Sequence, residues 1–146
     1  MTLAAFFAQG HRDCDAGWAE LEQALGGKGD VAALWAKFHG EMERHLKMEE
    51  EVLFPAFEAA AGMTGCGPTE VMRYEHVQMR GVLAQIGEAI EAGNNEEAMD
   101  QGDTLLMLIQ QHNVKEEGML YRMAEQMLGA QWEQLHERLS AYDVSV

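Results

Sequence analysis

Basic residues, prolines and long apolar runs are scarce in this chain. Its 146 residues include 10 Lys and Arg against 25 Asp and Glu, a formal net charge of −15. Nucleic acids and anionic membrane surfaces require basic patches, so we expect neither as a partner. No segment approaches the run of about 18 apolar residues that predicts a membrane span. The N-terminal segment "MTLAAFFAQGHRDCD" lacks the basic region of a signal peptide. We therefore expect a cytoplasmic protein.

The chain has two cysteines, Cys14 and Cys66. A chain of 146 residues can bury a core without covalent staples, and nothing else indicates a disulfide-rich secreted scaffold. We therefore expect both thiols to be reduced and residues 1–146 to form a single domain.

The spacing of apolar residues is helical throughout, and no strand pattern is visible. Glycine-rich or proline-containing breaks at 26–30, 62–69, 93–95 and around Gly129 divide the chain. They predict four long helices. The first covers residues 9–25, and the second runs from the N-cap Asp30 to residue 61. The third begins behind the N-cap Thr69, and the fourth begins behind the N-cap Asn95. A short tail helix is expected within 130–142, and Pro55 predicts a kink or shift inside the second long helix. Short connections predict an all-α, antiparallel up-down four-helix bundle.

Two segments of the chain resemble two later segments. "HLKMEEEVLF" (45–54) matches "HNVKEEGMLY" (112–121) at an offset of 67, with a shared His-x-x-x-Glu-Glu and a final aromatic residue. "HRDCDAGWAELEQAL" (11–25) matches "HVQMRGVLAQIGEAI" (76–90) at an offset of 65. The chain therefore reads as two copies of a helical hairpin related by an approximate two-fold axis.

The repeated histidines and glutamates are predicted to face the core. Residues i and i+4 share one face of a helix, so His45 lies beside Glu49, and His112 lies beside Glu116. The other positions on these two faces are apolar: Trp35, Phe38, Met42, Val52 and Ala56 in one helix, and Leu105, Leu108, Met119 and Met123 in the other. His11 and His76 also lie on apolar stripes of their helices.

Buried polar groups without partners would each cost about 1–3 kcal/mol, a cost that a shared metal centre removes. A ligand set of nitrogen and oxygen without thiolate suits iron or manganese better than a structural zinc site. A lone core histidine is usually hydrogen-bonded, and a lone His-x-x-x-Glu is usually a surface pair. Two matched copies on apolar faces favour the metal centre.

Over about 120 residues, from His11 to Leu128, the sequence resembles the hemerythrin-like, HHE cation-binding proteins. The residues that carry the resemblance are His11, "HLKMEEEVLFP", "EHVQMR" and "HNVKEEGMLY". The resemblance implies a four-helix bundle around a non-haem, oxo- or hydroxo-bridged centre of two iron ions. It also implies a ligand set, with the two glutamates bridging the irons: His11, His45, Glu49, His76, His112 and Glu116.

Two positions depart from the oxygen-carrying members of the family. Those proteins have a second histidine four residues after the ligand of the third helix, where this chain has Arg80. They also place an aspartate five residues after the histidine of the fourth helix, whereas here Glu116 follows His112 at four. These departures put reversible oxygen carriage in doubt and place the chain nearer the branches linked to iron sensing or to nitric oxide and iron–sulfur stress. Arg80 could instead pair with Asp15, its counterpart in the repeat, and we favour a structural role for such a pair.

The remaining polar and sulfur-containing residues are predicted to have structural roles. His39 lies about 120° around the helix from His45 and is expected outside the site. His136 is expected at the surface, and Cys14 is expected to be a small core residue. Three acidic residues are expected to provide solubility: Glu50, Glu51 and Glu117. Five methionines are expected in the core or over the site: Met42, Met48, Met72, Met79 and Met119.

Six protein ligands leave at least one exchangeable position on two octahedral ions. The first hypothesis is accordingly a protein that binds or senses O2, NO, peroxide or iron. Alternatives are an enzyme that reduces NO or decomposes peroxide, an iron donor or store for iron–sulfur cluster repair, and a metal-free bundle that binds a partner in a groove. The partner expected from the first hypothesis is a small diatomic or peroxide, and a homodimer is one possible oligomeric state.

Overall fold

The computed structural model describes residues 1–63 and 67–142, and this part of the chain contains helices and no strands. The first hairpin begins with α1 (Leu3–Leu25), which starts before the predicted residue 9 because the Thr2 side chain caps it by accepting from the Ala5 amide at 3.1 Å. The next helix, α2 (Val31–Met48), begins behind Asp30 as predicted. No helix among the described residues is long and apolar enough to cross a membrane.

The second hairpin consists of α4 (Pro68–Glu91) and α5 (Asn95–Lys115). Both predicted N-caps are wrong. Gly67 precedes α4, and Thr69 is buried one residue inside the helix, where its hydroxyl donates to Glu58 Oε2 at 2.7 Å. The cap of α5 is Asn94, whose side chain accepts from the Glu97 amide at 3.1 Å. Cys66 lies outside the described residues.

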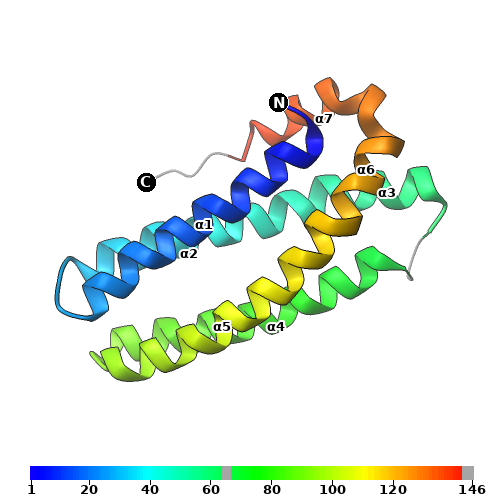
Figure 1. Ribbon diagram of the computed structural model, residues 1–146. Coiled ribbons are helices and arrows are strands. Elements are labelled where there is room, and N and C mark those ends of the chain that lie inside the picture. The colour runs from blue at the N-terminus through cyan, green and yellow to red at the C-terminus, as the bar shows by residue number, and fades with distance from the viewer. Residues whose placement is uncertain (64–66, 143–146) are drawn as a thin grey trace.

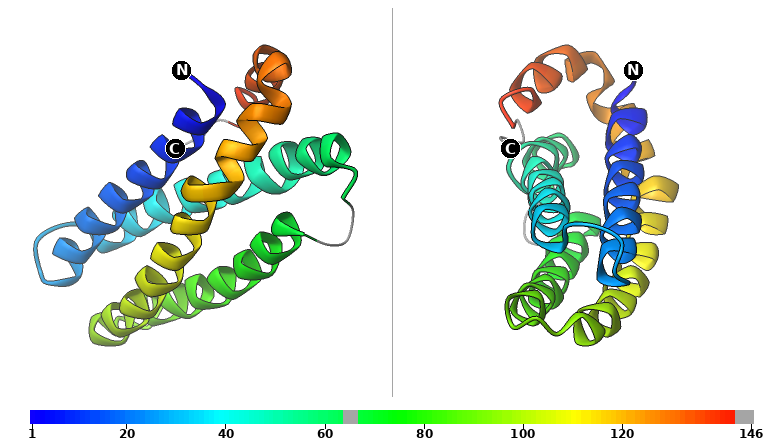
Figure 2. Two further views of the ribbon diagram at one scale, coloured as in Figure 1. Left: turned by 45° about the vertical axis from the view of Figure 1, so that its right-hand side comes forward. Right: turned by 90° about the vertical axis from the view of Figure 1, so that its left-hand side faces the viewer.

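The two hairpins pack against each other as an antiparallel bundle, with α1 beside α2 and α4 beside α5 (Figures 1 and 2). This confirms the predicted all-α fold and its hairpin repeat. The predicted tail is also helical: a 3-10 turn, η3 (Gly129–Gln131), leads into α7 (Trp132–Leu139). It lies at the end of the bundle near the N-terminus, where Trp132 Nε1 donates to the Met1 carbonyl at 2.8 Å.

A π-helical turn interrupts one helix of each hairpin, and both turns begin at a predicted ligand. In the first hairpin, η1 (Glu49–Leu53) separates α2 from α3 (Phe54–Ala61). In the second hairpin, η2 (Glu116–Leu120) separates α5 from α6 (Tyr121–Leu128). The Phe54 and Tyr121 amides reach back five residues, to the carbonyls of Glu49 and Glu116. The shift predicted near Pro55 is therefore present, but its counterpart in the second hairpin contains no proline.

The proline leaves one carbonyl in η1 without its helical partner. With the π-turn register, the Glu50 carbonyl would accept from residue 55, and Pro55 has no amide hydrogen. Arg73 of α4 supplies the missing donor, with Nη1 at 3.3 Å from this carbonyl. The two hairpins are thereby joined next to Glu49.

The extra residue in the second π-turn changes which side chains face the core. The regular spacing predicts Met119 inside, but Met119 is 47% exposed, whereas Leu120 and Tyr121 are each 1% exposed. That prediction is wrong because a π-turn moves the buried face by one position.

Two apolar clusters lie on opposite sides of the predicted ligands. The first cluster contains Phe7, Met48, Phe54, Met72 and Tyr121 among its members, and the second contains Cys14, Trp18, Met42, Met79 and Ile109. Along α1, α2 and α4, the predicted histidine falls between a member of the first cluster and a member of the second. In the second hairpin, His112 falls between Ile109 of the second cluster and Leu120 of the first. The polar residues thus form one layer across the middle of the bundle.

Candidate metal centre

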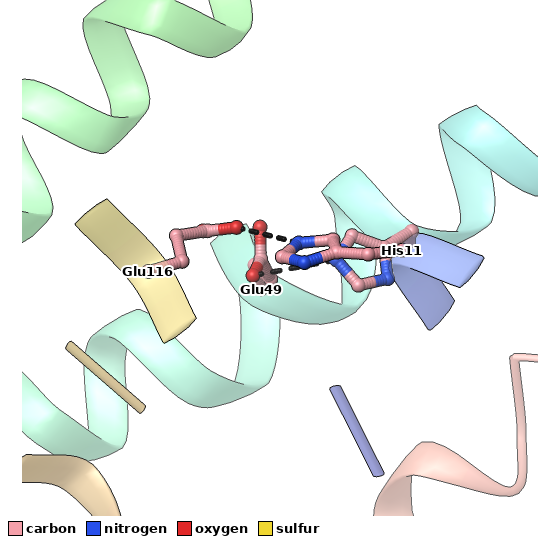
Figure 3. A group of neighbouring side chains, drawn as sticks. His11, Glu49 and Glu116 are labelled. Atoms are coloured by element: carbon pink, nitrogen blue, oxygen red, sulfur yellow. Dashed lines mark hydrogen bonds and ion pairs between the residues drawn. The ribbon is translucent and has the colours of Figure 1, made fainter. Parts of the chain in front are cut away.

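All six predicted ligands meet in this layer. The four histidines come from α1, α2, α4 and α5, and the two glutamates begin the π-turns. Each is buried, with Glu49, Glu116 and His76 at 0% exposure. Figure 3 shows His11, Glu49 and Glu116 converging from three different helical segments.

The six residues form two overlapping groups, each of which could hold a metal ion. The first group is His11, His45, Glu49 and Glu116, and the second group is Glu49, His76, His112 and Glu116. Within each group, one nitrogen or oxygen per residue lies within 4.8 Å of the others. Both glutamates belong to both groups, which is the arrangement that a carboxylate-bridged pair of ions requires.

Several inward-facing atoms have no hydrogen-bond partner, and among them are Glu49 Oε1, Glu116 Oε2, His76 Nε2 and His112 Nε2. His76 Nε2 lies 3.1 Å from Glu49 Oε1, and His112 Nε2 lies 3.0 Å from Glu116 Oε1, without hydrogen-bond geometry. Buried polar atoms are almost always satisfied in folded proteins. A cation bound between these nitrogen and oxygen atoms would give each of them the partner that it lacks.

The outer nitrogens of three histidines contact carboxylates. Nδ1 lies 2.8 Å from Glu117 in His11, 2.7 Å from Glu50 in His76 and 2.8 Å from Glu75 in His112. The interpretation of Glu50 and Glu117 as solubility charges is therefore wrong. Glu51 is exposed and accepts from the Tyr142 hydroxyl.

These outer carboxylates orient the imidazoles for metal binding. An ionised carboxylate only accepts hydrogen bonds, so Nδ1 carries the hydrogen and the lone pair of a neutral ring lies on Nε2, which faces inward. Histidines that bind metals are commonly held by a carboxylate in this way.

Arg80 does not pair with Asp15, the partner that the repeat had suggested. Its guanidinium donates to Glu50 at 2.6 and 3.1 Å and to Glu43 at 2.9 Å. Arg80 follows His76 by one turn of α4 and faces α2, so both side chains reach the same carboxylate. Burial alone would raise the pKa of Glu50, but the hydrogen bonds from His76 and Arg80 lower it to about 2. Arg80 thus keeps the partner of His76 ionised.

His45 is the exception among the four histidines, because its Nδ1 is buried without a partner. The repeat explains the difference: Glu75, which holds His112, corresponds to Gly10 at the offset of 65. A Cβ on Gly10 would overlap the His45 imidazole. Glycine is therefore needed here for the close approach of α1 to the ring.

We expect Gly10→Ala to displace the His45 ring and weaken metal binding by about 10–100-fold, the loss typical of disturbing the support of a ligand. Gly81→Ala is the matched control, since an added Cβ at Gly81 in α4 meets no atom within 4 Å. Metal titrations of both variants measure the effect. Equal affinities in the two variants would show that His45 does not need its present position.

The charges of the layer raise the pKa of the inward histidines when no metal is bound. Burial opposes protonation of His11, but the hydrogen bond and negative charge of Glu116 outweigh burial and raise the pKa to about 9. The pKa of His76 is likewise raised to about 9, against burial, by Glu49 and Glu50. Burial raises the pKa of Glu49, yet the neighbouring histidines hold this pKa well below its usual value. Without a metal, protons therefore take the place of a cation.

Sequence reasoning missed two residues that contact the site. Glu75 holds His112 but has glycine as its counterpart in the first hairpin, so the repeat gave no signal. Tyr121 has its hydroxyl in the middle of the first group. The aromatic residue that ends both copies of the repeat was the available signal, because only one of the two carries a hydroxyl.

Most of the residues that were assigned structural roles are placed as predicted. His39 is exposed and stacks on Trp35, outside the site, and His136 is exposed. Cys14 is buried in the second apolar cluster, where burial raises the pKa of its thiol to about 12. Four of the five methionines are buried, and Met119 is the exception.

A cavity of about 20 Å³ adjoins the layer on the side of the second apolar cluster. Its lining includes His11, His45 and His112 together with Cys14, Met42, Leu46, Met79 and Ile109. Such a volume holds about one water-sized molecule. Asn113 lines both this cavity and a surface groove of about 520 Å³ that is also lined by Asp15 and Glu117.

The family comparison agrees with this geometry. The model of the hemerythrin HHE cation binding domain matches residues 2–124, a range that contains all six converging residues. Comparisons with curated proteins and with solved structures gave no match. The buried His and Glu groups and the family match together support a metal-binding protein. The chain belongs to the hemerythrin HHE cation-binding family.

Proposed function

We propose that the protein holds two iron ions, one in each group, bridged by Glu49 and Glu116, and that this centre binds or senses O2, NO or peroxide. The observation that carries the proposal is the pair of four-residue groups that share both glutamates. The donor set has two imidazoles and two carboxylates for each ion and no thiolate, which suits iron.

The residues fit such a centre in charge as well as in number. Two ionised carboxylates shared by two cations leave the inward Nε2 atoms to act as neutral ligands, and the outer carboxylates balance further positive charge. When bound, the irons would supply one-electron redox steps and open coordination positions. The protein orients the ligands through the Nδ1 contacts and limits access through its apolar surroundings.

The cavity supports a ligand of diatomic size. Its walls on the side of the second apolar cluster are apolar or sulfur-containing side chains, and three of the histidines complete the lining. A ligand larger than a few atoms has no room there. Asn113 lines both this cavity and the surface groove, so a small molecule could enter past its side chain.

The test is to load the protein with ferrous iron under anaerobic conditions and to add O2, NO or peroxide separately. Binding or sensing predicts a spectral change that saturates at a fixed ratio of ligand to protein. Continued consumption over many cycles would instead establish an enzyme, and transfer of iron to a chelator or acceptor would favour an iron donor. No spectral change with any of the three ligands would contradict the proposal.

The metal-free protein should lose stability as the pH rises from about 6.5 to about 9. The pKa values of His11 and His76 are raised by folding to about 9 from about 6.5, so their contribution is complete below pH 6.5 and disappears as the pH rises through 9. Urea unfolding of the metal-free protein at several pH values measures this. His76→Gln should flatten the dependence, and exposed His39→Gln should leave it intact. A flat profile in the unmodified protein would contradict the charge arrangement described here.

A further inference from the structure

The two ion-binding groups differ at one position that the hairpin repeat makes equivalent. Tyr121 begins α6 directly after η2, and Phe54 begins α3 directly after η1, at the offset of 67. Both side chains are buried in the first apolar cluster beside the polar layer. Only Tyr121 carries an oxygen, so the two halves of the layer are chemically unequal.

The Tyr121 hydroxyl contacts every member of the first group. Its oxygen lies 2.5 Å from Glu49 Oε2, 2.9 Å from Glu116 Oε1, 3.0 Å from His11 Nε2 and 3.4 Å from His45 Nε2. One hydroxyl hydrogen cannot serve both carboxylates, which only accept hydrogen bonds. The Tyr121 oxygen therefore lies among the potential ligand atoms of the first group. From this position it can bind the same ion as they do.

The second group has no such oxygen. The Phe54 ring packs against His76, with ring centroids 5.6 Å apart, and the Arg73 guanidinium lies over the Phe54 ring, 5.3 Å from its centroid. The side of the layer that faces the first apolar cluster is therefore closed by a hydroxyl at one ion and by a hydrocarbon ring at the other. The small cavity lies on the opposite side, with the second apolar cluster.

We propose that Tyr121 is a further metal ligand, which binds as a phenolate the ion held by the first group and not the ion held by the second. This inference rests on the proposed iron centre. Binding forms a bond between the phenolate oxygen and the ion and releases the phenol proton to solvent, with no electron transferred.

Phenolate ligation makes the two ions unequal. The ion of the first group would gain a phenolate ligand, besides imidazole and carboxylate, on the side away from the cavity. The ion of the second group would keep more open coordination positions. A ligand that enters through the cavity therefore meets one ion whose coordination is more complete than that of the other.

The test uses the full-length protein loaded with ferrous iron and then oxidised by O2 in air. A ferric ion bound by phenolate gives a charge-transfer band in the visible region, and resonance Raman excitation in that band enhances tyrosine ring vibrations. We expect both signals in the unmodified protein and their loss in Tyr121→Phe, with iron still bound. Tyr74→Phe is the matched control, because Tyr74 is 63% exposed and its loss should leave the band in place.

Ring-deuterated tyrosine incorporated into the unmodified protein should shift the enhanced vibrations, which keeps the test valid if Tyr121→Phe does not fold. Two irons per chain without a visible band or tyrosine vibrations would overturn the role of Tyr121 and leave the iron centre standing. Absence of iron from the unmodified protein would overturn the iron centre itself, and this inference with it. A band that persists in Tyr121→Phe would also overturn the assignment.

Discussion

Glu49→Gln is expected to reduce bound iron from two ions per chain to less than one. Glu49 belongs to both groups, and its side chain is 0% exposed, so solvent does not compensate for the lost negative charge. The change keeps the shape of the side chain and removes one bridging charge from both ions at once. The loss of affinity should exceed the roughly 10–100-fold effect typical of residues that only support a ligand.

Iron analysis and titration under anaerobic conditions measure this effect, and Glu51→Gln is the control. Glu51 is an exposed neighbour in the same π-turn and contacts Tyr142, not the histidines. The Glu51→Gln variant should retain both irons. Two tightly bound irons in Glu49→Gln would show that this carboxylate does not bridge the ions.

Removal of iron is expected to lower the melting temperature of the unmodified protein by about 5–10 °C. Iron at about 100 times its dissociation constant stabilises the folded state by about 2.7 kcal/mol. For a chain of this size, each kcal/mol corresponds to about 2–4 °C. The physical source is the polar layer, where inward-facing atoms of four of the six ligands lack hydrogen-bond partners unless a cation is bound.

Thermal unfolding with and without added ferrous iron, and after chelation, measures this shift. The double variant Glu49→Gln, Glu116→Gln is the control, since its melting temperature should not respond to iron. An unmodified protein whose melting temperature is the same with and without iron would indicate that the layer is satisfied by protons alone.

Helical periodicity was enough to predict that the four histidines and two glutamates face the core, and the resemblance to the hemerythrin-like proteins implied that all six are ligands. A spacing of four places His45 beside Glu49, and the same spacing places His112 beside Glu116, whatever the details of packing. Their recurrence on apolar faces indicated that all of them meet in the core, and the structure brings them together. The helix boundaries were less predictable, because Asn94 and Asn95 are equally good caps in the sequence and only one of them is used.

The contacts between hairpins could not be predicted from spacing. The partners of Arg80 depend on which neighbouring segments its face of α4 meets. These are α2, which supplies Glu43, and η1, which supplies Glu50. The π-turn at Glu116 had no proline to announce it, and it moved Met119 outward and Tyr121 into the layer. The repeat indicated matching residues but gave no register for the segments that follow the turns.

The most direct test of the account is to count iron in the reconstituted protein and to record its electron paramagnetic resonance spectrum in the ferric state. Two ions that share Glu49 and Glu116 are coupled through the carboxylates. The account predicts two irons per chain and no signal from isolated ferric ions. One iron per chain with an isolated ferric signal, or no iron at all, would contradict it.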